Sequence, residues 1–174
     1  MKVEVGGRPT WRAVLGAVLC ASALAVAVPA NAQTDGAFLR NAVEGGNFEV
    51  QVGQLAERNA GSEQVRLLGY MIATDHARSD ESLRQLAFME KASLSSESLS
   101  NTRKLQQLGR LHGAAFDKAF LQTITASHKA DIAVFLQEAT NGTDVALRQF
   151  AERALPTLQK HLSMAQQLRS QVGQ

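Results

Sequence analysis

Four polar side chains occupy positions where the apolar faces of four predicted helices would normally carry leucine or isoleucine. Glu49, His76, His128 and His161 each lie on a different apolar stripe, counted at 3.6 residues per turn. Burying such groups without partners costs about 1 to 3 kcal/mol each, so they should meet one another, a water molecule or a metal ion. The four stripes are Phe38, Ala42, Gly45, Glu49, Val52 and Ala56; Val65, Gly69, Ile72, His76, Leu83 and Ala87; Leu121, Ile124, His128, Ile132 and Phe135; and Leu147, Phe150, Ala154, His161, Ala165 and Leu168.

Periodicity and turn residues predict four long helices and one short one. Their expected ranges are 36–59, 62–89, 102–111, 114–140 and 144–172. Thr34 or Asp35 is expected to cap the first helix, and Pro156 should kink the last one. Aromatic residues make up only 5% of the chain, and helix-forming residues dominate. The sequence therefore predicts an all-α domain.

The connection between the second and third long helices, roughly residues 91–113, is longer than an up-down-up-down bundle needs. A connector of that length can cross the bundle from end to end. The chain also shows a weak internal repeat, because Asp35-Gly-Ala-Phe-Leu39 recurs 82 positions later as Asp117-Lys-Ala-Phe-Leu121. At the same offset Glu49 matches Asp131. Two related helix pairs joined by a crossover are the plan of ferritin-like four-helix bundles.

The first 32 residues have the pattern of a cleaved Sec-type signal peptide. Three basic residues precede an apolar run, which ends in Ala30-Asn31-Ala32, so we expect a mature chain of residues 33–174 forming a single domain. Cleavage would remove the only cysteine, Cys20. It would also remove three of the 18 basic and one of the 16 acidic residues, which leaves 15 of each.

A net charge near zero argues against nucleic acid as a partner, because nucleic-acid binding requires a basic excess. An anionic membrane surface is disfavoured for the same reason, and we expect no stable membrane insertion after cleavage. The predicted location is the bacterial periplasm or the medium. The sequence is compatible with a homo-oligomer and with an unknown protein partner.

Six segments of the chain resemble, in order and spacing, the bacterial domain-of-unknown-function family 4142. This resemblance covers nearly all of the expected mature chain and implies an exported, ferritin-like protein whose activity has not been established. Members of that family often carry Asp-His on the third long helix, whereas Ser127 precedes His128 here. The matching segments are Asp35-Gly-Ala-Phe-Leu39, Glu44-Gly-Gly-Asn-Phe-Glu49, Met71-Ile-Ala-Thr-Asp75-His76, Gly113-Ala-Ala-Phe-Asp117, His128 and Leu155-Pro156-Thr-Leu-Gln-Lys-His161.

A di-iron site of the ferritin-like type is disfavoured. Such sites use Glu-x-x-His on two helices, but Ala73 and Leu158 stand three residues before His76 and His161. Three imidazoles and one carboxylate suit a single divalent ion instead, namely Zn, Cu, Ni or Fe(II). We therefore expect no catalytic residues and no ferroxidase activity.

Further candidate ligands lie close to these four residues in the sequence. Asp80 and Asp131 stand one turn from His76 and His128, and Asp75 is placed to orient a histidine from a neighbouring helix. Met164 would suit Cu(I), although a methionine on an apolar stripe usually fills a core. His112, in the connector, is expected to be exposed.

Two functions follow from this reading. The first is an exported bundle that binds one metal ion through Glu49, His76, His128 and His161, for sequestration or in stress protection. The second is a structural or interaction bundle in which these residues form a metal-free polar network that fixes helix packing. Bound metal in the purified protein would distinguish the first from the second.

Overall fold

The chain folds into an all-α bundle, which confirms the predicted fold class. The computed structural model describes residue 1, residues 30–89, residue 94 and residues 98–172. The helices are α1 (Ala30–Asn59), α2 (Glu63–Met89), α3 (Leu99–Gly109), α4 (Gly113–Asn141) and α5 (Val145–Val172). Most of the expected leader therefore lies outside the described residues. Among the helices that are described, none is both long and apolar enough to cross a membrane.

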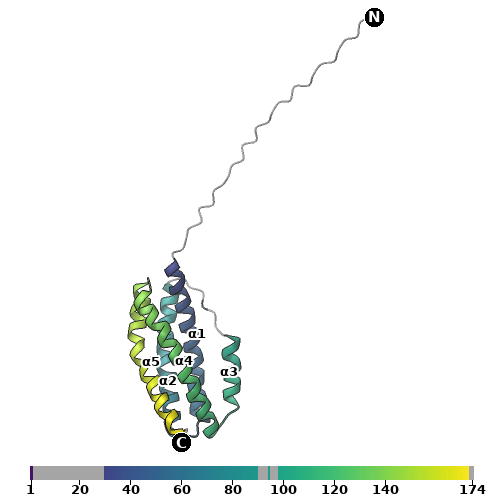
Figure 1. Cartoon of the computed structure of the whole chain (residues 1–174), viewed down its shortest axis with the longest axis vertical. Helices are drawn as coiled ribbons and strands as arrows, with labels where there is room; N and C mark the ends of the chain where they lie inside the picture. The colour runs from purple at the N-terminus through teal and green to yellow at the C-terminus, as the bar shows by residue number, and fades with distance from the viewer. Residues whose placement is uncertain (2–29, 90–93, 95–97, 173–174) are drawn as a thin grey trace.

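The four long helices form two antiparallel pairs, α1 with α2 and α4 with α5 (Figure 1). Helix α3 lies along the outside of α1 and returns the chain to the end of the bundle where α4 begins (Figure 1). Helix α1 then packs against α4, and α2 packs against α5. This arrangement is the crossover plan expected from the length of the connector.

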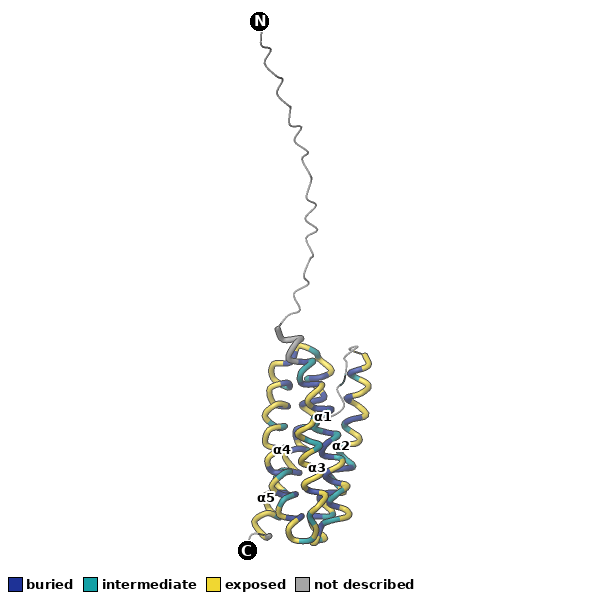
Figure 2. Tube along the Cα trace, turned by 90° about the vertical axis from the view of Figure 1, so that its right-hand side faces the viewer, coloured by how far each residue is buried: buried dark blue, intermediate teal, exposed yellow. Residues whose placement is uncertain are grey.

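Buried side chains divide into two apolar clusters at different levels of the bundle. One cluster surrounds Phe116 and Phe120 near the α1–α2 turn, and the other surrounds Phe38 and Phe135 near the α4–α5 turn. Figure 2 shows the buried residues on the inward faces of the helices, with exposed residues outside. Each of the four polar stripe residues falls in the sequence between members of these two clusters. The polar centre therefore lies at the junction of two apolar cores.

Helices α1 and α2 approach each other closely at two glycines. A Cβ atom on Gly53 would lie 2.5 Å from the carbonyl oxygen of Gly69, and one on Gly69 would lie 2.4 Å from the Cβ of Ala56. Gly53 stands about one turn after Glu49 on α1, and Gly69 stands two turns before His76 on α2. The missing side chains therefore let these two helices bring Glu49 and His76 together.

Asp35 does not cap the helix in which it lies, so the expected local cap is wrong. Helix α1 begins earlier, at Ala30, and places Asp35 inside it. The Asp35 carboxylate accepts hydrogen bonds from the backbone N–H of Thr143, at 3.0 Å, and of Asp144, at 2.8 Å, and also from the Thr143 hydroxyl. Burial raises the pKa of Asp35, but these hydrogen bonds outweigh it and lower the pKa overall. Asp35 thus holds the turn between α4 and α5.

Asp117 makes the equivalent contacts at the opposite end of the bundle. Its carboxylate accepts hydrogen bonds from the backbone N–H of Gly61, at 3.0 Å, and of Ser62, at 2.8 Å, in the turn between α1 and α2. Asp117 is the residue that matches Asp35 in the internal repeat, 82 positions later. Each helix pair therefore caps the turn of the other pair.

The two turns repeat the same hydrogen bonds at this offset. Ser62 Oγ accepts from the N–H of Val65, and the Asp144 carboxylate accepts from the N–H of Leu147. Arg66 donates to the carbonyl of Ala60, and Arg148 donates to that of Gly142. In each case the residue in the second turn stands 82 positions after its counterpart in the first turn. The weak sequence repeat thus corresponds to a repeated structural unit.

Candidate metal centre

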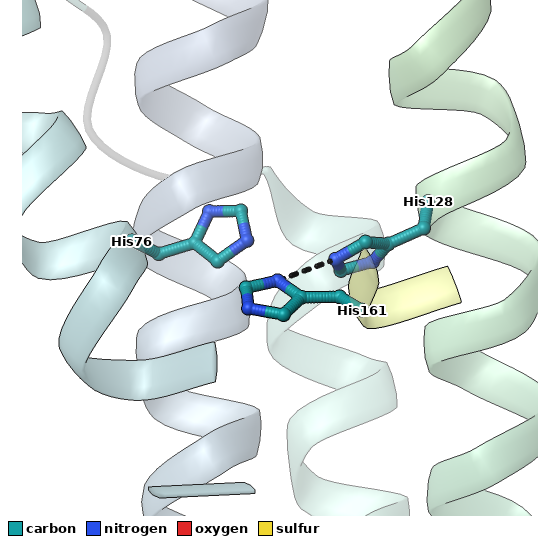
Figure 3. A group of neighbouring side chains, drawn as sticks. All are labelled: His76, His128 and His161. Atoms are coloured by element: carbon teal, nitrogen blue, oxygen red, sulfur yellow. Dashed lines mark hydrogen bonds between the residues drawn. The ribbon is translucent and has the colours of Figure 1, made fainter. Parts of the chain in front are cut away.

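The four polar stripe residues converge at one level of the bundle. Helix α1 carries Glu49, α2 carries His76, α4 carries His128 and α5 carries His161. Glu49 is 1% exposed, His128 and His161 are fully buried, and the His76 side chain is 11% exposed. Figure 3 shows the three imidazole rings turned toward one another from three helices. The structure thus brings together the residues that the sequence selected.

Glu49 is shared between two histidines. Its Oε2 lies 3.0 Å from His76 Nε2, and its Oε1 lies 2.9 Å from His128 Nδ1. The hydroxyl of Ser127 donates a 2.6 Å hydrogen bond to the same Oε1. Burial raises the pKa of Glu49, but the charges of His76 and His128 outweigh burial and hold the pKa well below its usual value. Glu49 is therefore an ionised carboxylate in the core.

A chain of hydrogen bonds continues from His128 to Asp75. His128 Nε2 lies 3.2 Å from His161 Nδ1, and His161 Nε2 lies 3.1 Å from Asp75 Oδ2 (Figure 3 draws the first of these). Burial, and then the charges of His128 and His76, lower the pKa of His161 to about 4. Because a carboxylate only accepts, His161 Nε2–H donates to Asp75, which leaves Nδ1 to accept from His128.

Both ring nitrogens of His128 have polar partners. Its Nε2 lies 3.2 Å from His161 Nδ1, and its Nδ1 lies 2.9 Å from Glu49 Oε1. His128 therefore links Glu49 to the pair formed by His161 and Asp75.

His76 is less well satisfied than the other two histidines. Its Nε2 lies near Glu49 Oε2, but the two groups are not aligned for a hydrogen bond, and no other group pairs with this buried nitrogen. Burial lowers the pKa of His76, but the negative charge of Glu49 outweighs burial and raises the pKa overall. His76 Nε2 is thus a buried ring nitrogen beside Glu49 that lacks a hydrogen-bond partner within the described part of the chain.

Two groups of side chains in the described part of the chain are close enough to share a metal ion. One contains His76, His128 and His161, with one ligand atom of each lying within 4.8 Å of the others. The other contains Glu49, His128 and Asp131. Both groups include His128, and together they include all four stripe residues.

The secondary candidates are distributed around this cluster. Asp75 contacts His161 directly, whereas Asp80 belongs to neither metal-binding group. Met164 packs against the apolar cluster around Phe116 and Phe120, as expected of a core methionine, and His112 is exposed. Burial and then the charge of Glu49 raise the pKa of Asp131 to about 7.

Sequence reasoning missed the role of Ser127. Members of the family often carry an aspartate before this histidine, and Ser127 stands in its place here. The carboxylate beside His128 is instead that of Glu49, and the Ser127 hydroxyl donates a hydrogen bond to it. The 78-residue separation of Ser127 and Glu49 offered no local signal for this contact. Periodicity did place Ser127 next to the inward stripe, and this was the available clue.

A cavity of about 410 Å³ adjoins the cluster on the side of His76. Glu49, His76, Asp80 and Asp131 contribute to its wall, together with apolar residues of all four long helices. The stripe analysis did not predict this cavity, because a volume depends on how the helices are spaced and not on which faces they bury.

Comparison with known proteins supports the family and the fold. The family model described as Domain of unknown function (DUF4142) matches residues 21–168. A crystal structure from Streptomyces coelicolor, described as a secreted protein of the DUF305 family, superposes with a TM-score of 0.71. The two are 17% identical, and the match covers 80% of this chain and 92% of that one. No curated protein matches the sequence. By the extent of the family match, the chain belongs to the domain-of-unknown-function family DUF4142.

Proposed function

We propose that this protein is an exported bundle that binds a single divalent transition-metal ion through His76, His128, His161 and Glu49. The observation that carries the proposal is the convergence of three imidazole nitrogens within 4.8 Å, in the buried centre of the bundle. Zn, Cu, Ni and Fe(II) all accept such ligands. The proposed role is metal sequestration or a stress-related role, and no catalytic residue is assigned.

The distances between neighbouring ligand atoms suit a tetrahedral ion. Metal–ligand bonds of about 2.0 to 2.1 Å at tetrahedral angles separate adjacent ligands by about 3.3 Å. His128 Nε2 and His161 Nδ1 are 3.2 Å apart, and His76 Nε2 and Glu49 Oε2 are 3.0 Å apart. Two edges of the required tetrahedron are therefore close to their final length before an ion binds.

The outer nitrogens of two histidines are held by carboxylates. Glu49 Oε1 lies 2.9 Å from His128 Nδ1, and Asp75 Oδ2 accepts from His161 Nε2. Metal-binding histidines commonly donate their second N–H to a carboxylate, which fixes the ring and makes the ligand more basic. In this arrangement Glu49 serves twice, with Oε1 orienting His128 and Oε2 available as the fourth ligand.

Export is part of the proposal. The signal-peptide pattern of residues 1–32 supports it, and the structural neighbour from Streptomyces coelicolor is described as secreted. An exported metal-binding domain needs no cysteine ligands, and none would remain after cleavage at Ala32. The periplasm is the compartment in which we expect the mature protein to bind its ion.

The second candidate function is a structural or interaction bundle with a metal-free centre. The continuous chain of polar contacts from Glu49 through His128 and His161 to Asp75 favours it, because these buried groups are partners for one another without an ion. Buried polar networks of this kind can fix helix packing. A metal-free network does not explain why the buried Nε2 of His76 lacks a hydrogen-bond partner.

Thermal melting of chelator-treated protein separates the two functions. An ion that binds only the folded state should raise the melting temperature at pH 7.5, with about 2.7 kcal/mol of added stability at a hundredfold excess over Kd. At pH 5.5 the increment should shrink, because protons compete for the imidazoles. His161→Gln should abolish the increment, and His112→Gln, which alters an exposed histidine, should keep it. If none of the four metals shifts the melting temperature at pH 7.5, the metal-free network is the correct reading.

A further inference from the structure

The cavity beside the metal centre has an acidic wall that neither proposed function uses. Asp80 and Asp131 line it together with His76 and Glu49. Among the residues that the structure describes, neither aspartate takes part in an ion pair, although Glu49 and Asp75 both do. Asp80 is 6% exposed, and its Oδ1 has no hydrogen-bond partner. A buried carboxylate without a cation is costly, so this wall is suited to receive one.

A second metal ion is a poor candidate for the cation that Asp80 would bind. A protein metal site needs several converging ligands, and neither of the two groups close enough to share an ion contains Asp80. An ammonium group makes fewer demands, since each of its N–H groups needs only one acceptor. The Asp80 and Asp131 carboxylates can supply such acceptors.

Part of the cavity wall is apolar and buried. Leu83 and Leu158 line it together with the rings of Phe135 and Phe150, and all four side chains are buried. A volume of about 410 Å³ lies within the range of small-molecule sites, which are mostly apolar with a few polar groups that fix orientation. Aromatic faces also attract organic cations. The cavity thus combines a charged wall with a surface for an apolar body.

Two arginines at the cavity do not reverse this charge preference. Arg78 and Arg153 are both exposed, and Arg78 already lies 3.7 Å from Asp75. Their charges are screened by water, whereas Asp80 is buried and Asp131 is half-buried. An anionic ligand would have to approach the buried carboxylates, which would repel it.

We infer that the cavity is a binding site for a small organic cation, with a primary ammonium group on Asp80 and Asp131 and an apolar body against Phe135 and Phe150. This inference does not depend on the metal site. It assigns the protein a second ligand, of a different chemical class, that binds next to the histidine cluster.

Calorimetric titration of chelator-treated protein with three matched probes tests the inference. Phenethylamine carries the ammonium, 2-phenylethanol is its neutral analogue, and phenylacetate is an anion of similar size. We expect phenethylamine to bind about tenfold or more tightly than the alcohol, because a desolvated charge pair forms only with the amine. Phenylacetate should not bind. Equal affinity for the amine and the alcohol, or no amine binding at millimolar concentration, would overturn the inference.

Variants locate the site. Asp80→Asn and Asp131→Asn keep the shape of the side chain and should each weaken amine binding severalfold, while Glu81→Gln removes an exposed charge beside Asp80 and should leave it unchanged. If Asp80→Asn does not fold, Gly45→Leu provides an independent test by filling the cavity. A Cβ on Gly45 meets only Asp131 Oδ1, at 3.9 Å, so this position has room for a larger group. Amine binding that survives both Asp131→Asn and Gly45→Leu would place the amine elsewhere and contradict the inference.

Discussion

At the scale of single residues, the centre of the bundle depends on one buried carboxylate. Glu49 contacts His76, His128 and Ser127, so its removal leaves groups on two other helices without their partner. Its charge also raises the pKa of His76, although burial acts in the opposite direction. This dependence holds with or without a metal ion.

Glu49→Gln should lower the free energy of unfolding by about 1 to 3 kcal/mol, because the amide removes the buried negative charge and replaces one of the two acceptor oxygens with a donor. Glu57→Gln is the matched control, since Glu57 lies on the same helix and is exposed. Urea denaturation of the two variants measures the difference. Equally small losses for both would show that Glu49 contributes little to the core.

A second buried carboxylate, Glu138, should make stability depend on pH. Burial first, and then the charges of Asp35 and Asp144, raise the pKa of Glu138 to about 7, and its Oε1 has no partner. The folded protein therefore holds a proton that the unfolded chain releases near its ordinary pKa of 4.5. Glu138 is thus easiest to bury at low pH, and its contribution to stability falls as the pH rises from about 4.5 through 7.

Glu138→Gln should remove this loss and raise stability at pH 8 by about 1 to 3 kcal/mol relative to wild type. At pH 4.5 the variant and the wild type should be nearly equal. Glu152→Gln, which alters an exposed residue on α5, serves as the control. Chemical denaturation at several pH values checks the prediction, and parallel pH profiles for Glu138→Gln and the wild type would refute it.

At the scale of helices, the stripe pattern predicted which faces turn inward but not how close the helices come. The expected ranges agree with the structure to within three residues, except at the start of α1. That helix begins at Ala30 and not near residue 36, since Asp35 satisfies a distant turn and does not cap its own helix. A cap is read from local sequence, and this contact spans 108 residues, so no local rule could have found it.

Gly69→Ala tests the close approach of α1 and α2. The new Cβ would lie 2.4 Å from that of Ala56, so the helices must separate, at a cost of about 1 to 3 kcal/mol. Gly45→Ala on α1 has room and should instead stabilise the helix by about 0.5 to 1 kcal/mol. Denaturation curves for both variants give the signs, and a stabilising Gly69→Ala would rule out tight packing at this position.

At the scale of the whole molecule, the bundle is built from a repeated helix pair. The sequence showed this repeat only in a few residues, but the paired caps by Asp35 and Asp117 extend it to both turns. The metal centre departs from the repeat, because the position that matches His128 in the first pair is Gly46. The sequence therefore predicted the plan and the four inward residues, whereas their contacts, Ser127 and the cavity required the three-dimensional structure.

The two caps should contribute independently to stability. Asp35→Ala and Asp117→Ala should each cost about 1 kcal/mol, since each leaves backbone donors of a turn unpaired. The caps lie at opposite ends of the bundle, so the double variant should lose the sum of the two to within about 0.5 kcal/mol. Urea denaturation of the three variants tests this. A strongly non-additive double variant would mean that the two ends are coupled.

The most direct test of the central claim is the metal content of the exported protein. The protein should be purified from its native compartment without a metal-affinity tag and examined by elemental analysis. We expect one transition-metal ion per chain, lost in His128→Gln and retained in His112→Gln, because only the first of these histidines faces the centre. A wild-type protein without stoichiometric metal, which also takes up none when supplied with Zn, Cu, Ni or Fe, would contradict the account.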